Sequence, residues 1–373
     1  MALGVVILAF GALPVKAEPD TTLHACTKVS VLDDAGQSIF GIEDMALDVG
    51  RNRLILSAYD RFAVMEAMDD GVSPPGGGLY SISLDQLALV SRSENLTATK
   101  LEFRGTDAPL HPHGIGLLDD GVQVRLAVVS RLSDTHDTSV ADLLLFDVAD
   151  DILALRARGQ GDAYCRANDV ALIDPDTAVF TFDQNRCGSW GVWAERVFQP
   201  RSSGLRIARF DEGTATSETL VDDLAFANGV AVDTERKTVL VTASRDRLLR
   251  TYSLDTLLKG ESDVLSSMSF DGGPDNVSLS SDGKVVTAVH PDPFALFLHM
   301  NRWGDLPASR VVLSAPDTNR QEVVDDAHGS LPGAATAAVA IRDMIVVSSA
   351  WDAGLGICKQ VSAQSDLSHA DGG

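Results

Sequence analysis

The sequence predicts an all-β protein, a six-bladed β-propeller whose blades surround a central channel. Three observations lead to this prediction: a strand–turn–strand pattern recurs six times along the 373 residues, helix signals are sparse, and no Gly/Ser-rich or Pro-rich linker divides the interior. Four-stranded units repeated around a ring shield their sheet edges from solvent, which explains why closed propellers are stable.

Each copy of the pattern has alternating apolar positions, a turn and then a β-branched run. The copies begin at Met45, Gly114, Asp169, Gly229, Asn276 and Ala337, at intervals of about 47 to 70 residues. Each interval has room for a second hairpin, so four strands are expected in each unit. A fold with helices between its strands would need amphipathic stretches of about 10 to 15 residues. Only residues 85–90 and 139–146 weakly resemble helices.

The N-terminal region resembles an export signal. Residues 2–13 are apolar, and Val15-Lys16-Ala17 forms a small-x-small cleavage site. We therefore predict a signal peptide over 1–17, a propeller over 18–358, a polar disordered tail over 359–373, and a secreted or periplasmic location. An uncleaved anchor is the alternative, because no Lys or Arg precedes the apolar run, and membrane association is expected only if this segment is retained.

Four cysteines, Cys26, Cys165, Cys187 and Cys358, are expected to form two disulfides in an oxidising compartment, with three pairings open. The positions favour one pairing. Cys26 follows the predicted cleavage site and Cys358 precedes the tail, so their bond would tie the chain ends together, as a ring requires. Cys165 and Cys187 would then pair across a short segment. Buried free thiols are the alternative.

The chain is strongly acidic, with 30 Lys+Arg against 53 Asp+Glu and a net charge of −23. This charge repels phosphate backbones, so we expect no nucleic-acid partner. With only 8 His and 4 Cys, the composition favours oxygen-ligand cations such as calcium over zinc or copper.

Polar side chains stand at the start of five of the six predicted inner strands. They are Glu43-Asp44, His111-Pro112-His113, Asn168-Asp169, Phe226-Ala227-Asn228 and Asp275-Asn276. Innermost strands line one channel, so residues at the same place in successive repeats converge on its axis. Carboxylate and amide oxygens are calcium ligands, and without a cation crowded acids raise each other's pKa values. Asn and Asp also serve as turn residues, but recurrence at one phase favours a metal site.

Five motifs at these positions, GIEDMALD, HPHGIGLL, ANDVALI, FANGVAVD and DNVSLSSDG, and a sixth that follows them, AVHPDP, resemble in order those of the serum paraoxonase (arylesterase/lactonase) family. The resemblance spans about residues 26–358, with Cys26 and Cys358 where that family has its end-closing disulfide. It implies a six-bladed propeller with two calcium ions in the channel, in agreement with the repeat count.

The resemblance also implies two ligand sets. The catalytic calcium would be held by Glu43, Asn168, Asn228, Asp275 and the side chain of Asn276. The structural calcium would be held by Asp44, Asp169 and the backbone carbonyl of Ile115.

His113 matches the family's proposed general base, and His290 matches a second histidine at the channel mouth. Phe226 and Phe297 match apolar pocket positions, and Asp183 matches an acid that the family also has. Two departures matter. Arg131 stands where the family has a histidine that partners the base, which argues against a histidine dyad. Gln184 replaces the histidine that follows the acid.

The implied reaction is hydrolysis of carboxylic esters, chiefly lactones and aryl esters, with promiscuity toward aryl phosphotriesters. Calcium would polarise the carbonyl oxygen while water attacks, and no GxSxG elbow suggests a covalent nucleophile. Arg131 would lower the pKa of His113, so Asp275 and Glu43 are substitute bases, and Asn168 completes the catalytic set. Two alternatives stay open: a gluconolactonase-type sugar lactonase with one metal, and a non-catalytic propeller braced by calcium.

Overall fold

The computed structural model describes residues 24–90, 95–106, 108–133, 139–188, 201–315, 321–325 and 329–360. The predicted signal peptide lies outside the described residues, as does the tail from residue 361 onward. No helix in the described ranges is long and apolar enough to cross a membrane.

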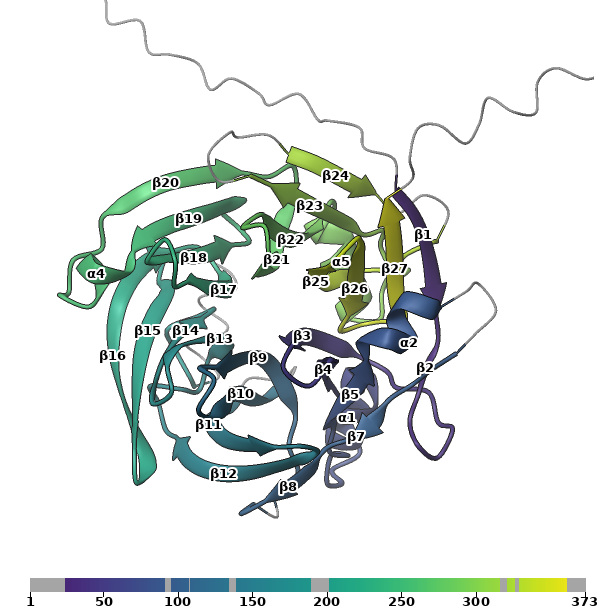
Figure 1. Ribbon diagram of the computed structural model, residues 1–373, viewed down its shortest axis with the longest axis horizontal. Coiled ribbons are helices and arrows are strands. Elements are labelled where there is room, and N and C mark those ends of the chain that lie inside the picture. The colour runs from purple at the N-terminus through teal and green to yellow at the C-terminus, as the bar shows by residue number, and fades with distance from the viewer. Residues whose placement is uncertain are drawn as a thin grey trace, which may run out of the picture.

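Six four-stranded blades surround a common axis (Figure 1). The inner strands are β3 (Ile42–Asp48), β9 (Pro112–Asp119), β13 (Ala167–Asp174), β17 (Ala227–Asp233), β21 (Gly273–Leu279) and β25 (Ala335–Ile341). The second strands are β4 (Arg53–Ala58), β10 (Val124–Ser133), β14 (Thr177–Phe182), β18 (Thr238–Ala243), β22 (Val285–His290) and β26 (Met344–Ser349). All six inner strands coincide with the repeats found in the sequence, which confirms the predicted propeller.

The third strands are β5 (Gly78–Ser83), β11 (Ser139–Ala149), β15 (Ser203–Asp211), β19 (Leu248–Ser253), β23 (Arg310–Ser314) and β27 (Leu355–Gln360). The outer strands are β7 (Thr99–Lys100), β12 (Ile152–Gly159), β16 (Gly213–Leu224), β20 (Val264–Ser269), β24 (Gln321–Asp325) and β1 (His24–Val29). Short strands β2 (Val31–Leu32) and β6 (Leu96–Thr97) pair with each other, and β8 (Glu102–Arg104) pairs with the outer strand β12. A parallel contact of β12 with β16 joins the second and third blades into one sheet.

The hydrophobic core lies between neighbouring blades. Among the described residues, six clusters of buried side chains each join two adjacent blades. The second strands therefore face a core on both sides, and all six residues of β4 are buried. This double burial explains why their sequences are continuous apolar runs rather than strict alternations.

The ring closes between the two ends of the described chain. β1 pairs antiparallel with β27, and Cys26 lies opposite Cys358 in that register. These cysteines form a disulfide across 332 residues, and Cys165 bonds to Cys187 across 22 residues. Both predicted pairings are therefore confirmed. β27 extends to Gln360, two residues past the predicted end of the propeller at residue 358, because His24 and Gln360 pair at its end.

The helices differ from the sequence prediction. Residues 139–146 form part of β11, because the apolar side chains between Ala141 and Phe146 are buried between two blades and do not cover a helical face. The structure has α1 (Arg61–Asp69), α2 (Leu84–Leu89), α4 (Leu254–Leu257) and α5 (Pro293–Met300). The helix expected over residues 85–90 corresponds to α2. The two longer helices, α1 and α5, start at aspartate N-caps that the sequence analysis did not use, Asp60 and Asp292.

Candidate metal centre and active site

Backbone bulges place the predicted ligands at the end of the channel where the inner strands begin, here called the upper end. Pairing with the second strand shifts register across Glu43, across Asn168 and Asp169, across Asn228, and across Asp275 and Asn276. A bulge sets two residues opposite one and turns side chains out of the regular alternation. Consecutive polar residues can therefore both approach the channel, which a regular strand would not allow.

Hydroxyl groups on the second strands hold these bulges together between blades. Ser57 Oγ donates to the His113 carbonyl (2.5 Å), Thr181 Oγ1 donates to the Asn228 carbonyl, and Thr242 Oγ1 donates to the Asp275 carbonyl (2.6 Å). The sequence analysis missed these residues. A signal was present, because Ser or Thr stands at the same place near the end of four second strands, β4, β14, β18 and β26, as in LILSA, VFTF and VLVTA.

Glycines let neighbouring inner strands approach closely at this level. A Cβ on Gly114 would lie 2.4 Å from the Asp169 Cα, and one on Gly229 would lie 2.6 Å from the Asn276 Cα. Both distances are too short for any side chain. The close approach brings β9 to β13 and β17 to β21, so the polar pairs of adjacent blades lie beside each other.

Four acids are buried at the upper end: Glu43, Asp44, Asp169 and Asp275 are each no more than 7% exposed. Burial raises the pKa of Glu43 from 4.5 to about 7, although Arg61 opposes the rise, and Asp275 adds to it. Burial likewise raises the pKa of Asp44 from 3.8 to about 7. The pKa of Asp169 lies well above 3.8 because of burial and the charge of Asp44. Such a cluster needs either protons or a cation.

Three asparagine side chains turn their amide nitrogens away and leave their oxygens without partners. Asn168 Nδ2 donates to Asp183 Oδ2 (3.4 Å), Asn228 Nδ2 donates to Ser244 Oγ (3.3 Å), and Asn276 Nδ2 donates to the Glu43 carbonyl (3.3 Å). All three Oδ1 atoms are buried and accept no hydrogen bond. A buried carbonyl oxygen without a partner costs free energy, so these oxygens suit a bound cation.

Two histidines adjoin the acids. His113 Nδ1 lies 3.3 Å from Glu43 Oε1, and His290 Nε2 lies 2.7 Å from Asp275 Oδ2. Burial lowers the pKa of His113 well below its ordinary value of 6.5, and Arg61 and Arg131 lower it further. His113 is therefore neutral here, and a positive charge on its ring is disfavoured.

Arg61, which the sequence analysis missed, lies beside the acids as the first residue of α1. Its Nη2 lies 2.6 Å from Glu43 Oε2, and its Nη1 donates to the Ala350 carbonyl. The guanidinium also lies 4.3 Å from the centre of the Tyr59 ring. An isolated arginine after a strand gives no sequence signal for this role.

Three residues predicted to line the substrate pocket differ in how far they are exposed to solvent. Phe226 is half-buried and has a left-handed φ of 61°. The guanidinium carbon of Arg245 lies over its ring, 5.1 Å from the ring centre. Phe297 lies on α5, 49% exposed, with its ring 6.1 Å from that of Trp303. Asp183 is 3% exposed and pairs with two arginines, so it contributes a buried ion pair and little pocket surface.

A cavity of about 200 Å³ continues along the channel below this level. Asp44, Asp169, Asn276 and Ile115 line its upper part, together with apolar residues from all six inner strands. The set predicted for the second cation therefore borders an internal space. Ile115 N donates to Asp44 Oδ2 at 2.8 Å, and Val230 N donates to Asp169 Oδ2 at 2.7 Å, which fixes both carboxylates in place.

The donor set fits a hard cation. Within the described part of the chain, no three His, Cys, Asp or Glu side chains meet closely enough to hold a metal by themselves. A cation at the upper end would therefore need amide oxygens as well as carboxylates, and the three partnerless Oδ1 atoms supply them. Mixed carboxylate and amide oxygens are the ligands that calcium prefers.

The fold and site together define a six-bladed propeller with a buried acid-and-amide centre at one end of its channel. Residues 76–350 match the arylesterase family. The chain therefore belongs to the arylesterase family, in agreement with the resemblance seen in its motifs.

Curated relatives match over shorter regions. The chain is 32% identical over 98 residues to adipocyte plasma membrane-associated protein Hemomucin of Drosophila melanogaster, covering 25% of this chain and 17% of the relative. It is 30% identical over 93 residues to protein strictosidine synthase-like 13 of Arabidopsis thaliana, covering 25% and 22%. The matched region thus spans about a fifth of these relatives' length.

Among solved structures, a luciferin-regenerating enzyme is similar with a TM-score of 0.49 and 12% identity, covering 91% of this chain and 96% of the other. A calcium-binding regucalcin from Agrobacterium tumefaciens is similar with a TM-score of 0.49 and 13% identity, covering 89% and 96%. A putative gluconolactonase is similar with a TM-score of 0.48 and 13% identity, covering 86% and 89%.

Proposed function

We propose that this protein is a calcium-dependent hydrolase of carboxylic esters, chiefly lactones and aryl esters, with promiscuous action on aryl phosphotriesters. Membership of the arylesterase family supports an esterase or lactonase type of propeller. The three buried amide oxygens without partners, beside four buried acids, are the observation that carries the calcium requirement.

Two ions are proposed. One would be held by Glu43, Asn168, Asn228, Asp275 and Asn276, and the other by Asp44, Asp169 and the Ile115 carbonyl. A calcium ion at the first site would supply a Lewis acid for the substrate carbonyl oxygen and for the negative charge that develops on it.

The chain's own residues would handle the proton. His113 is neutral, so it can take a proton from the attacking water and return it to the leaving alcohol or phenol. Glu43 Oε1, 3.3 Å from His113 Nδ1, would stabilise the protonated ring. Asp275 is the alternative base. The proton that it takes from water would then be shared between Asp275 Oδ2 and His290 Nε2, which lie 2.7 Å apart. Burial of all four side chains limits access of bulk water.

We also propose that the protein works in a secreted or periplasmic setting, which its two disulfides support because such bonds persist in oxidising compartments.

The test is a panel of lactones, aryl esters and one aryl phosphotriester, assayed with and without a calcium chelator, beside a count of bound metal. We expect hydrolysis to be lost on chelation and regained with calcium, and two ions per chain. Ester hydrolysis that survives exhaustive chelation would refute the calcium requirement. One ion per chain with sugar-lactone activity would favour the gluconolactonase type. Bound calcium without hydrolysis would favour a binding propeller.

A further inference from the structure

Asp183 occupies an unusual position in this site, because its buried carboxylate contacts a proposed calcium ligand and two arginines at once. Arg131 Nη1 lies 2.7 Å from its Oδ2, and Arg166 Nη2 lies 2.6 Å from its Oδ1. Arg166 Nε donates to the same Oδ1 at 2.9 Å. Asn168 Nδ2 donates to Oδ2 at 3.4 Å. The carboxylate is therefore fixed by a two-pronged contact on one side and an ion pair on the other.

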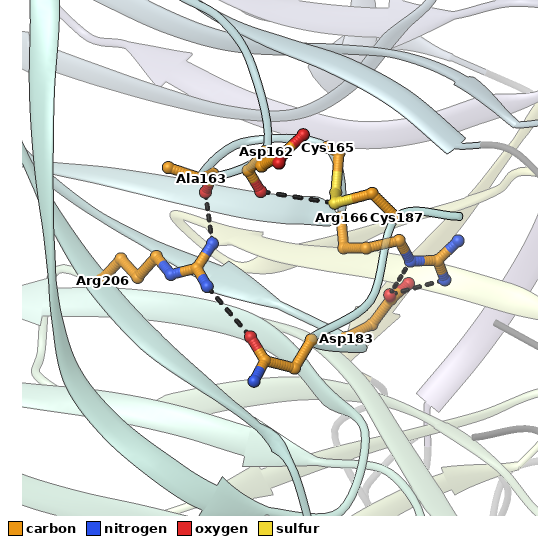
Figure 2. The surroundings of a disulfide bond; sticks show 8 residues. Asp162, Ala163, Cys165, Arg166, Asp183, Cys187 and Arg206 are labelled. Carbon is orange, nitrogen blue, oxygen red and sulfur yellow. Dashed lines mark hydrogen bonds and ion pairs between the residues drawn. A yellow bond between two sulfur atoms is a disulfide. The ribbon is translucent and has the colours of Figure 1, made fainter. Parts of the chain in front are cut away.

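The Cys165–Cys187 disulfide lies close in sequence to both Arg166 and Asp183. Arg166 follows Cys165 directly, and Asp183 stands four residues before Cys187, so the disulfide ties together the two segments that carry the arginine and the acid (Figure 2). In the figure the Arg166 guanidinium is turned toward the Asp183 carboxylate. The Asp183 N–H also donates to the Arg166 carbonyl at 3.2 Å.

An ionised carboxylate is an acceptor only, and this decides how a neighbouring amide can lie. With Nδ2 toward Asp183, Asn168 presents Oδ1 to the channel. A flip of the amide would bring two acceptor oxygens together and would present an NH₂ group to a cation. Of the three amides, Asn276 is oriented by a backbone carbonyl and Asn228 by a hydroxyl that can donate or accept. Only Asn168 depends on a charged side chain.

We propose that Asp183 is a positioning residue that fixes the amide of Asn168 so that Oδ1 faces the proposed calcium, and that Arg131 and Arg166 hold the carboxylate for this task. The inference rests on the proposed function, because it takes Asn168 as a ligand. It assigns Arg131, which stands where the related family has a histidine, to the support of a metal ligand through Asp183.

The experiment is calorimetric titration of calcium into chelator-treated, full-length protein. Asp183→Asn keeps the shape but makes the side chain both donor and acceptor, so we expect a calcium dissociation constant about 10 to 100 times higher. The double variant Asn168→Asp, Asp183→Asn reverses this hydrogen bond, because the amide at position 183 now donates to the carboxylate at position 168. That carboxylate presents an oxygen to the cation in either orientation. We expect the swap to restore most of the lost affinity.

Asp48 offers a matched control, because it is a buried aspartate with two arginine partners at the other end of β3. Arg53 Nε donates to Asp48 Oδ2 at 2.9 Å, and Arg51 Nη1 lies 3.5 Å from Oδ1. Asp48→Asn and Asp183→Asn should both lower the unfolding temperature, but Asp48→Asn should leave calcium affinity unchanged. An equal loss of calcium affinity in this control would show a general stability effect and overturn the inference.

Unchanged affinity in Asp183→Asn would also overturn the inference, as would a swap that binds calcium no better than the single variant. If Asp183→Asn does not fold, a crystal structure of the wild type with calcium decides the question. Asn168 Oδ1 on the ion with Nδ2 on Asp183 supports the inference, and Nδ2 turned away from Asp183 contradicts it. Wild type that binds calcium but hydrolyses no ester would refute the proposed function alone, since the titrations measure binding.

Discussion

Removing calcium should make the stability of this protein fall steeply as pH rises from about 5 to 8. In the metal-free folded state, burial raises the pKa of Glu43 from 4.5 to about 7 and that of Asp44 from 3.8 to about 7. The unfolded chain has ordinary pKa values near 4. Between these limits the folded state binds more protons than the unfolded state, so the free energy of unfolding decreases as pH rises.

The size of the effect follows from the two raised pKa values. At about 1.4 kcal/mol per pKa unit, Glu43 alone accounts for about 3 kcal/mol and Asp44 alone for about 4 kcal/mol. These figures cover the whole titration of each group. About two pKa units of each shift fall between pH 5 and pH 7, so the combined loss from pH 5 to pH 8 is about 5 kcal/mol or less. Bound calcium keeps both groups ionised in the folded state, so the loaded protein should not show this decline.

The assay is urea unfolding at several pH values, with calcium or with chelator. We expect the difference in stability between the two forms to grow by up to about 5 kcal/mol from pH 5 to pH 8. Asp44→Asn should flatten the pH dependence of the chelated protein, because it removes one of the groups whose pKa is raised. A chelated protein whose stability is constant or increases from pH 5 to 8 would refute the reasoning.

Three further predictions concern closure and catalysis. Replacing both Cys26 and Cys358 by Ser should lower the free energy of unfolding by up to about 6 kcal/mol, and replacing both Cys165 and Cys187 by about 3 kcal/mol, because the two disulfides close loops of 332 and 22 residues. Urea unfolding of the two double variants measures both losses. Equal losses would contradict the argument from loop entropy. Asp275→Ala should abolish hydrolysis of every substrate and weaken calcium binding, and retained turnover would remove it from the site. His113→Gln should lower lactone and aryl-ester turnover by about 10² to 10⁴ and remove a limb of the pH–rate profile. A limb that persists in this variant would point to Asp275 as the base.

Much of the fold could be predicted because it is encoded locally. Alternating apolar positions and turn residues specify strand–turn–strand units such as the one starting at Met45, and the recurrence of these units gives the blade number. The cysteines near the ends, Cys26 and Cys358, indicate closure, because a ring brings first and last strands together. The repeat phase also selected Glu43 and Asn168, since the same position in each inner strand lies at the same level of the channel.

The sequence pattern did not predict the correct element where a strand is buried on both faces, because such a strand lacks the apolar–polar alternation. Residues 139–146 contain an apolar run without strict alternation, which suits a helix as well as a strand, and packing between two blades makes the segment part of β11. The helices α1 and α5 have only an N-capping aspartate and a short apolar segment as sequence signals, and they are not part of the strand–turn–strand repeat.

Sequence alone thus determined the propeller, its closure and the residue types at the upper end of the channel, because these follow from short-range patterns repeated at regular intervals. Tertiary structure alone decided which atoms meet there. The pairing of Arg61 with Glu43, the support of Asn168 by Asp183, and the amide oxygens left without partners all join segments that approach only when the ring is closed. Such contacts depend on the bulges and on the distance between blades, and neither leaves a periodic trace in the chain.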